Sequence, residues 1–453
     1  MSLGACGAGR ANEPSAPGPS APAAPSTPTP DANDAPPTDD EAKAVIAKAL
    51  AHVAEIRRLA AKTPVKGAVI SRDALLARIK NDLLVDLEPD LIEGTRELLF
   101  ALNLTRGDFD YFENLLLLYG TQLAGFYDPQ AKEMVLLDDL GVEAQEATLW
   151  HELVHALQDQ NYDLQKLTKW KPERGDAVSA AQSFAEGDAT SAMMDMMLLP
   201  RGQRALDVPE ALVTQSMAAI EALPEVRDVP SILKRSIVAP YTDGLAFTHA
   251  LRREGEWARV DEAWKQPPET TEQLLHPEKY RAREAAESVP LPPPLPGGPT
   301  TVRYRDVLGE QTIRLVLEDW LPLDTARKAA SGWAGDRVAV FMDENRRAVG
   351  IGLRYDDEVS ARRGFEAIVR GALSEPIEKR TGVRSDTADA GAKAARASQF
   401  CAERELRGPF AVARSGRDLG VTLGPYTRDS GATRTAASCR SVLPWAARIA
   451  KGR

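Results

Sequence analysis

The chain has 453 residues, of which 43% are hydrophobic and 27% are charged, so it is long enough for two or three domains with sizeable cores. Its formal net charge of -10, without a clustered run of Lys and Arg, argues against general nucleic-acid binding. Because no stretch of about 18 apolar residues occurs, no membrane-spanning helix is expected.

The N-terminal segment is expected to form no core. Residues 11–40 are dominated by Pro, Ala, Ser, Thr and Asp, and the tether predicted over residues 1–40 is extended and disordered. Near its start, Leu3-Gly4-Ala5-Cys6 looks like a bacterial lipobox, although the basic and apolar regions that normally precede one are missing. We expect an exported protein that is periplasmic or is anchored to the membrane through lipidated Cys6. The alternative is that Cys6 is an unmodified residue of a disordered tail.

The next part of the chain is mainly helical. Apolar residues recur near a 3.6-residue period over residues 41–62, and further helices are predicted at 74–84, 91–102 and 109–119. Between the first two helices, the short Val-rich segment Val65 to Ile70 is predicted to be a strand.

Residues 124–137 predict a β-hairpin, because two short apolar segments flank the turn Asp128-Pro129. We expect residues 133–138 to lie at an exposed sheet edge, where an extended peptide could pair with the backbone. A purely structural strand is the alternative. A helix with two histidines follows the hairpin, and another helix is predicted near residues 177–199.

Residues 288–300 contain a run of Pro and Gly and predict a linker between domains. Helices are predicted beyond it at 310–320, 323–331, 358–372 and 441–450, with strands at 337–342, 348–355 and within 400–423. The fold class is therefore α+β. We expect a larger domain at residues 41–287 and a smaller α+β domain of unknown role at residues 301–453.

Apart from Cys6, the chain contains only Cys401 and Cys439. An even pair of cysteines in an exported protein favours a disulfide bond, which would close a C-terminal loop. Two unpaired thiols are the alternative.

The strongest motif of the chain is His151-Glu152-Leu153-Val154-His155, in the helix predicted after the hairpin. Histidines four residues apart lie one turn apart on one helix face, so both imidazoles can bind the same metal ion. Glu152 lies one step round the helix, from where its carboxylate can reach a water beside the metal and act as a general base. The motif predicts a catalytic zinc site; a helix with two surface histidines is the alternative.

A third protein ligand is needed, because catalytic zinc sites combine three protein ligands with a water. No third histidine follows His155 closely, so a downstream acid is expected to serve. Glu186 is the preferred ligand, and Gly187 beside it would let two helices approach closely. Asp188 is the alternative, on a different face of the same predicted helix. Otherwise both acids would belong to a solvated acidic patch.

Together these features resemble the gluzincin metallopeptidases, most closely their exported and mostly uncharacterised bacterial members. The resemblance is carried by residues 125–129, by residues 148–160 and by Glu186-Gly187-Asp188-Ala189. It implies a zincin-like fold with His151, His155 and Glu186 as ligands of one Zn²⁺ and Glu152 as the base. Residues 268–280 and 332–337 look like further recurrent features of this group, without a role that the sequence assigns.

Two supporting roles stay open in the sequence. The tetrahedral oxyanion needs a His, Tyr or Arg beside the zinc; His276 is the leading candidate, and a structural His276 is the alternative. The other candidates for this role are Tyr127, Tyr241 and Tyr280. Thr190 stands where thermolysin-like enzymes have an Asp that orients a zinc ligand. The candidates for that orienting role are Asp159, Asp188 and Thr190.

The expected function is that of a zinc-dependent endopeptidase acting on a peptide or protein substrate. One rival is a tethered binding or structural lipoprotein that keeps a zincin scaffold without turnover; the presence of Glu152 argues against it, since structural zinc sites need no base. Another is a zinc hydrolase of a non-peptide amide or ester. Cleavage specificity and oligomeric state cannot be derived from the sequence.

Overall fold

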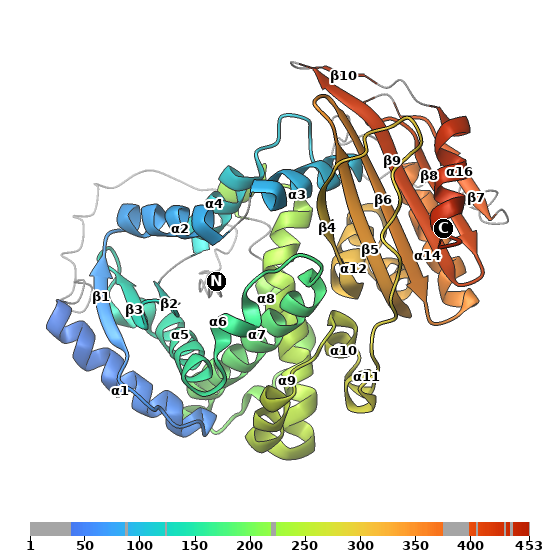
Figure 1. Ribbon diagram of the computed structural model, residues 1–453. Helices are drawn as coiled ribbons and strands as arrows, with labels where there is room; N and C mark the ends of the chain where they lie inside the picture. The colour runs from blue at the N-terminus through green and yellow to red at the C-terminus, as the bar shows by residue number, and fades with distance from the viewer. Residues whose placement is uncertain are drawn as a thin grey trace, which may run out of the picture. The chain divides into compact units, whose positions relative to one another are not determined.

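The computed structural model describes residues 38–86, 89–122, 125–218, 223–374, 398–404, 406–429, 432–434 and 438–452. Cys6 and nearly all of the tether predicted over residues 1–40 lie outside them. The fold is α+β, with a helix-rich N-terminal region and a separate antiparallel sheet in the C-terminal region (Figure 1). Within the described residues, no helix is long and apolar enough to cross a membrane.

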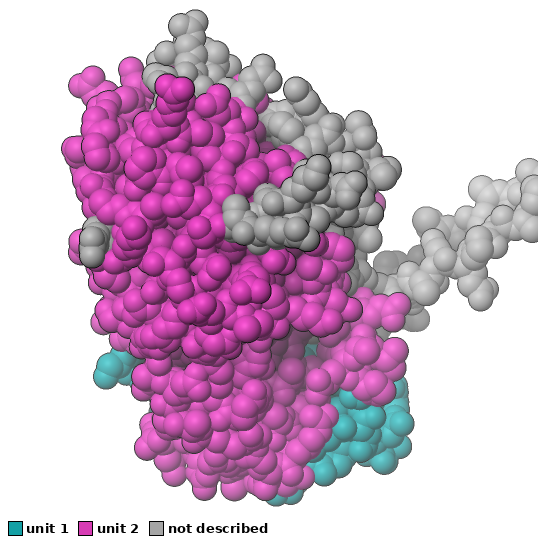
Figure 2. Space-filling model, turned by 90° about the vertical axis from the view of Figure 1, so that its right-hand side faces the viewer, with its two compact units in different colours: residues 1–81, 118–166, 188–208 teal, residues 82–117, 167–187, 209–453 magenta. Residues whose placement is uncertain are grey.

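The chain forms two compact units, which Figure 2 shows in different colours. Unit 1 comprises residues 1–81, 118–166 and 188–208, and unit 2 comprises residues 82–117, 167–187 and 209–453. This division does not follow the linker predicted at 288–300, because the residues on both sides of that segment belong to unit 2.

Unit 1 contains a three-stranded sheet with the strand order β1-β3-β2. Its strands and the helices that lie wholly in this unit are α1 (Asp39–Arg57), β1 (Lys66–Ile70), β2 (Gly125–Asp128), β3 (Glu133–Leu137) and α5 (Val142–Tyr162). Four helices contribute residues to both units: α2 (Arg72–Asp86), α4 (Tyr111–Gln122), α6 (Leu164–Thr168) and α7 (Gly175–Leu198). Short 3₁₀ turns at Leu199–Arg201 and Ala205–Asp207 follow α7.

The predicted hairpin is confirmed, but the prediction that residues 133–138 form an exposed sheet edge is wrong. β3 pairs antiparallel with β2 and parallel with β1, so it is the central strand. Residues 134–137 are all apolar and buried, which is typical of a strand covered on both faces. The strands at the edges of this sheet are β1 and β2.

Helix α5 packs on β2, β3 and α1 (Figure 1). Its apolar residues Leu153, Val154 and Leu157 are fully buried. The first turn of α5 is fastened to the end of β3 by Gln145, whose side-chain Oε1 accepts from Leu137 N at 2.9 Å while its Nε2 donates to Leu137 O at 3.0 Å. These hydrogen bonds therefore fix the N-terminal turn of α5, which precedes the two histidines in the sequence.

Unit 2 combines a helical layer with a seven-stranded antiparallel sheet of order β4-β5-β6-β9-β8-β7, in which β10 also pairs with β9. Its helices are α3 (Pro89–Ala101), α8 (Glu210–Ala218), α9 (Ser231–Lys265), α10 (Thr271–Leu275), α11 (Pro277–Ala282), α12 (Gly309–Trp320), α13 (Leu323–Ala330), α14 (Glu358–Ala372), α16 (Cys439–Ile449) and a 3₁₀ turn at Pro224–Val226. Its strands are β4 (Val302–Asp306), β5 (Trp333–Met342), β6 (Arg346–Tyr355), β7 (Gln399–Ala402), β8 (Phe410–Ser415), β9 (Asp418–Asp429) and β10 (Ala432–Arg434).

The two faces of this sheet are covered by different helices, since successive strand residues point to opposite sides. On one face, Ala339 and Phe341 of β5 belong to a buried cluster with Trp445 of α16. On the other face, Phe410 of β8 lies against Trp320 at the end of α12, with ring centroids 6.4 Å apart. Each face thus has its own apolar core.

The Pro-rich segment 288–300 has no helix or strand, as predicted, but it packs on the sheet of unit 2. Leu295 is buried in the same cluster as Trp445. The indole Nε1 of Trp445 donates to Pro293 O at 2.7 Å, and the Arg448 guanidinium donates to Pro294 O at 2.8 Å. The segment is therefore held by α16.

The expected disulfide between Cys401 and Cys439 is present, with their Cα atoms 5.8 Å apart. It joins β7 to the first residue of α16. Because α16 covers one face of the sheet, the bond ties this cover to an edge strand.

Candidate metal centre

The two histidines of α5 turn their Nε2 atoms toward each other at a distance of 3.1 Å. Two nitrogens bound to one zinc ion at about 2.0–2.1 Å in tetrahedral geometry lie about 3.3 Å apart. The observed spacing of His151 and His155 is close to that value. The helical spacing of the motif is therefore realised as a pair of converging imidazoles.

Both imidazoles and the intervening carboxylate lie in the interior. His151 and His155 are 1% exposed and Glu152 is fully buried. Ligand atoms of these three residues all lie within 4.8 Å of one another. Neutral imidazole nitrogens with a nearby carboxylate are donors that suit Zn²⁺, so the residues present fit the ion that the sequence predicts.

Glu152 is oriented by the hairpin. The backbone N–H of Tyr127 in β2 donates to Glu152 Oε2 at 2.9 Å. β2 lies at an edge of its sheet and packs on α5. The strand therefore holds the carboxylate next to the histidines in one orientation.

A second set of contacts reaches His155 from behind. Its Nδ1 lies 2.8 Å from Gln158 Oε1, and Gln158 Nε2 donates to Asp188 Oδ2 at 3.2 Å. Asp188 also accepts from Arg57 Nε at 2.6 Å and from Arg57 Nη2 at 3.1 Å. The sequence predicted Asp188 as a candidate for orienting a zinc ligand, but it did not indicate Gln158 or Arg57. Their part can be recognised only from contacts between distant parts of the chain.

The acid predicted as third ligand, Glu186, is buried in α7 with 4% exposure. It belongs to unit 2, whereas both histidines belong to unit 1, so its part in the metal centre stays a prediction. The alternative, Asp188, has its carboxylate bound by Arg57 and Gln158, which favours an orienting role.

The close approach predicted at Gly187 is made to α9. A Cβ atom added to Gly187 would lie 1.9 Å from the carbonyl carbon of Gly244, and one added to Gly244 would lie 1.7 Å from Ser183 O. Only glycine fits at such a helix crossing. The residue next to Glu186 thus fixes how α7 crosses α9 inside unit 2.

His276, the predicted oxyanion residue, lies between α10 and α11 in unit 2. Its Nε2 is 2.9 Å from Glu310 Oε1, and this contact raises the pKa of His276 above its ordinary value. These contacts connect α10 to α12, which is a structural role. The catalytic role of His276 stays a prediction.

The tyrosine alternatives are buried. Tyr127 donates its hydroxyl to Asp159 at 3.0 Å, and burial raises the pKa of Tyr127. Lys132 forms an ion pair with the same carboxylate. Tyr280 donates to Gln266 O at 3.0 Å. Of these groups, Tyr127 belongs to the strand that contacts Glu152.

The two later motifs, residues 268–280 and 332–337, meet at the start of α12. The Asp336 carboxylate accepts from Leu308 N at 2.8 Å and from Gly309 N at 2.9 Å. The Thr271 hydroxyl donates to Asp176 and accepts from Gln311 N at 3.1 Å. These motifs therefore build a buried polar junction within unit 2.

Burial strongly affects the acids of this junction. It raises the pKa of Asp176 to about 7 and the pKa of Asp336 to about 6. Burial also raises the pKa of Glu272 to about 7, although the ammonium of Lys279, 2.7 Å away, acts in the opposite direction.

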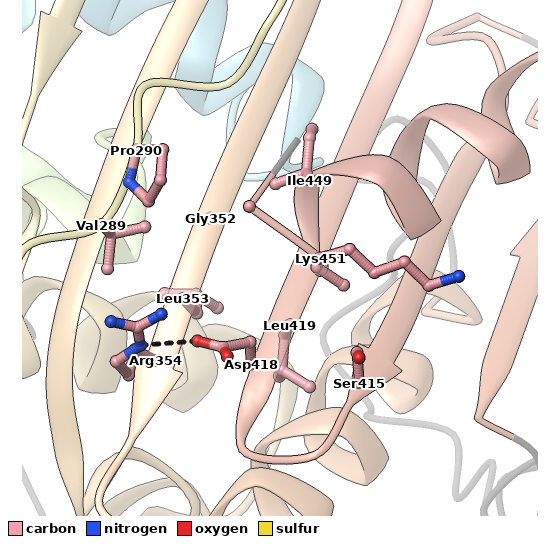
Figure 3. Close-up of a pocket in the computed structure, with 12 residues that line it drawn as sticks. Val289, Pro290, Gly352, Leu353, Arg354, Ser415, Asp418, Leu419, Ile449 and Lys451 are labelled. Carbon is pink, nitrogen blue, oxygen red and sulfur yellow. Dashed lines mark hydrogen bonds and ion pairs between the residues drawn. The ribbon is translucent and has the colours of Figure 1, made fainter.

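A pocket of about 410 Å³ lies in unit 2, between β6, β9 and the C-terminal end of α16. Figure 3 shows that two of its charged residues, Arg354 and Asp418, face each other, and Arg354 Nε donates to Asp418 Oδ1 at 2.7 Å. The charges of Arg354 and Asp418 neutralise each other, and Lys451 adds a third charged residue to the lining.

Comparison with known proteins covers the C-terminal region. A family described as "Domain of unknown function (DUF8575)" matches residues 300–434. No match was found among curated proteins or among solved structures. The matched region includes β4 to β10 and excludes the histidine pair, so it bears on the sheet of unit 2 and not on the chemistry of α5.

Proposed function

We propose that the protein is a zinc-dependent metallopeptidase of the gluzincin type, with a zincin-like fold around α5. The observation that carries the proposal is the convergence of His151 Nε2 and His155 Nε2 at 3.1 Å beside the buried Glu152. When bound there, zinc supplies a Lewis acid that lowers the pKa of a water molecule and polarises the carbonyl to be cleaved.

In this proposal Glu152 moves the proton. Its carboxylate accepts a proton from the attacking water and delivers it to the leaving amide nitrogen, so that the C–N bond breaks with release of an amine. The hydrogen bond from Tyr127 N holds the carboxylate beside the histidines. Glu186 is proposed as the third ligand, and His276 as the residue that stabilises the oxyanion.

An extended peptide is the proposed substrate, and β2 replaces residues 133–138 as the strand beside which it would bind. β2 is at an edge of the sheet, and its backbone contacts Glu152. All four residues of β2 are buried, which favours a second candidate, the hydrolysis of a small amide or ester. For the location, the lipobox-like segment and the Pro-rich tether support an exported protein.

The test combines metal analysis with digestion assays on the purified full chain. Wild type should bind about one zinc ion and cleave members of a peptide library. Glu152→Gln should keep the zinc and lose hydrolysis by at least roughly 1000-fold, because the general base is removed while the histidines remain.

The matched control is Glu146→Gln, which changes an exposed glutamate on the same helix and should leave both zinc and hydrolysis unchanged. A wild type without bound zinc at neutral pH would refute the proposal. Cleavage by Glu152→Gln at the wild-type rate would refute the role of Glu152. Turnover of amide or ester probes without peptide cleavage would select the second candidate.

A further inference from the structure

We propose that Arg57, Asp188 and Gln158 form a positioning chain that fixes the tautomer and orientation of His155, so that its Nε2 lone pair points at the metal. The inference rests on the proposed function for the identity of the metal. This positioning chain lies entirely in unit 1 and joins α1, α7 and α5.

The first step concerns the orientation of the Gln158 amide. An amide can present either its oxygen or its nitrogen to a neighbour, so its orientation must follow from the surrounding hydrogen bonds. The Asp188 carboxylate accepts hydrogen bonds, and it lies 3.2 Å from Gln158 Nε2. The amide nitrogen therefore faces Asp188, and Oε1 faces His155.

The second step follows for the imidazole. Because Gln158 Oε1 can only accept, His155 Nδ1 at 2.8 Å must carry the hydrogen and donate it. A neutral imidazole protonated on Nδ1 has its lone pair on Nε2. That atom is the one that lies 3.1 Å from His151 Nε2, so the chain selects the tautomer that can bind a metal at this point.

The third step concerns charge. Arg57 and Asp188 have side chains with no exposure to solvent, and the guanidinium contacts both carboxylate oxygens. A buried carboxylate is tolerated when it is paired and hydrogen-bonded. Arg57 thereby keeps the Asp188 side chain in place as an acceptor. Gln158 has no charge, so it orients the imidazole of His155 without adding a charge beside it.

The geometry makes Gln158 a positioning residue, since it acts through His155. Gln158→Met removes the hydrogen bond at similar volume and should weaken zinc binding by roughly 10- to 100-fold. The measurement is competition with a chelator of known affinity, on the full chain. Nitrogen NMR of the metal-free protein should show His155 protonated on Nδ1 in wild type and a mixture of tautomers in the variant.

Gln160→Met is the matched control. Gln160 lies on the same helix, and its Oε1 accepts from Lys62 N at 2.7 Å and from Thr63 N at 3.1 Å, outside the positioning chain. This variant should have lower thermal stability but unchanged zinc affinity and an unchanged His155 tautomer, which separates positioning from general destabilisation.

Equal zinc affinity of Gln158→Met and wild type, or a wild-type His155 protonated on Nε2, would overturn the positioning chain. Either result would leave the proposed function intact. A wild type that binds zinc tightly but hydrolyses none of the probes would refute the proposed function while the affinity difference still supported the positioning chain. A wild type without zinc affinity would refute both.

Discussion

Among the residues that the structure describes, two clusters of potential metal ligands, one in each unit, differ in what surrounds their donor atoms. In unit 1, His151 and His155 point their Nε2 atoms toward each other beside Glu152. In unit 2, three carboxylates also come together, but the ammonium of Lys279 lies 2.6–2.7 Å from each of them. These carboxylates belong to Glu272, Glu284 and Asp356.

The comparison shows that a group of acids and histidines is not in itself a metal site. In the cluster of unit 2 a cation of the protein itself, the Lys279 ammonium, already forms ion pairs with all three carboxylates. In the cluster of unit 1 the converging atoms are imidazole nitrogens, and His155 is in contact with Gln158, which is connected through Asp188 to Arg57 of α1. The two clusters therefore differ in residue type and in the Lys279 ammonium that lies among the carboxylates of unit 2.

The largest effect should come from removing a converging nitrogen. His155→Ala leaves a single histidine on α5, so zinc affinity should fall by at least roughly 1000-fold, equivalent to about 4 kcal/mol. Chelator competition measures this change. The control is His52→Ala, on the exposed side of α1, which should bind zinc like wild type. Retained affinity in His155→Ala would show that this pair is not the metal centre.

In unit 2, Asp176→Asn should change stability through pH. Burial raises the pKa of Asp176 from 3.8 to about 7, so the folded protein retains a proton that the unfolded chain releases. Its contribution is complete below about pH 4 and is lost as the pH rises to about 7, a change of up to about 4 kcal/mol. Asn accepts from Thr271 without titrating, so the variant should lose less stability than wild type over this range.

Urea unfolding at about pH 5 and about pH 8 measures this difference, with zinc content as a second reading. Zinc content should be the same in wild type and Asp176→Asn, because the junction is structural. Parallel stability curves for the two proteins would contradict the assignment of this pH dependence to Asp176.

The smallest effect is expected at Lys279. Lys279→Met leaves the buried carboxylate of Glu272 without its ammonium partner and should lower the free energy of unfolding by about 2 kcal/mol. Lys265→Met changes an exposed Lys at the end of α9 and should have little effect. Loss of zinc in Lys279→Met, without loss of stability, would contradict the structural role of this cluster and would connect it to metal binding.

Local sequence patterns predicted much of the fold and the centre of the site. The hairpin, α5 and α7 follow from apolar periodicity and turn residues, and the two histidines follow from their spacing. The full extent of α9 was not predicted, although His249 lies in a helical pattern; Pro240 lies inside this helix, and its backbone is non-helical at Gly255 and Glu256. A helix with such interruptions does not show one regular apolar period along its whole length.

Long-range pairing explains what the sequence could not show. The central place of β3 depends on parallel pairing with β1 across a long intervening segment, as between Lys66 and Glu133. The orientation of Gln158 depends on Asp188, which is 30 residues away in the sequence. Asp188 is in turn bound by Arg57, which lies 131 residues before it. No local period carries this information.

The Pro-rich segment 288–300 determines where a stable C-terminal fragment of this protein can begin. Its composition suggests a site for limited proteolysis or for separate expression of the C-terminal region. Yet Leu295 is part of the core beneath α16, and the carbonyls of Pro293 and Pro294 are bound by that helix. A protein that begins at residue 301 would expose this apolar surface to water and be prone to aggregation, so a fragment intended for study should retain the segment.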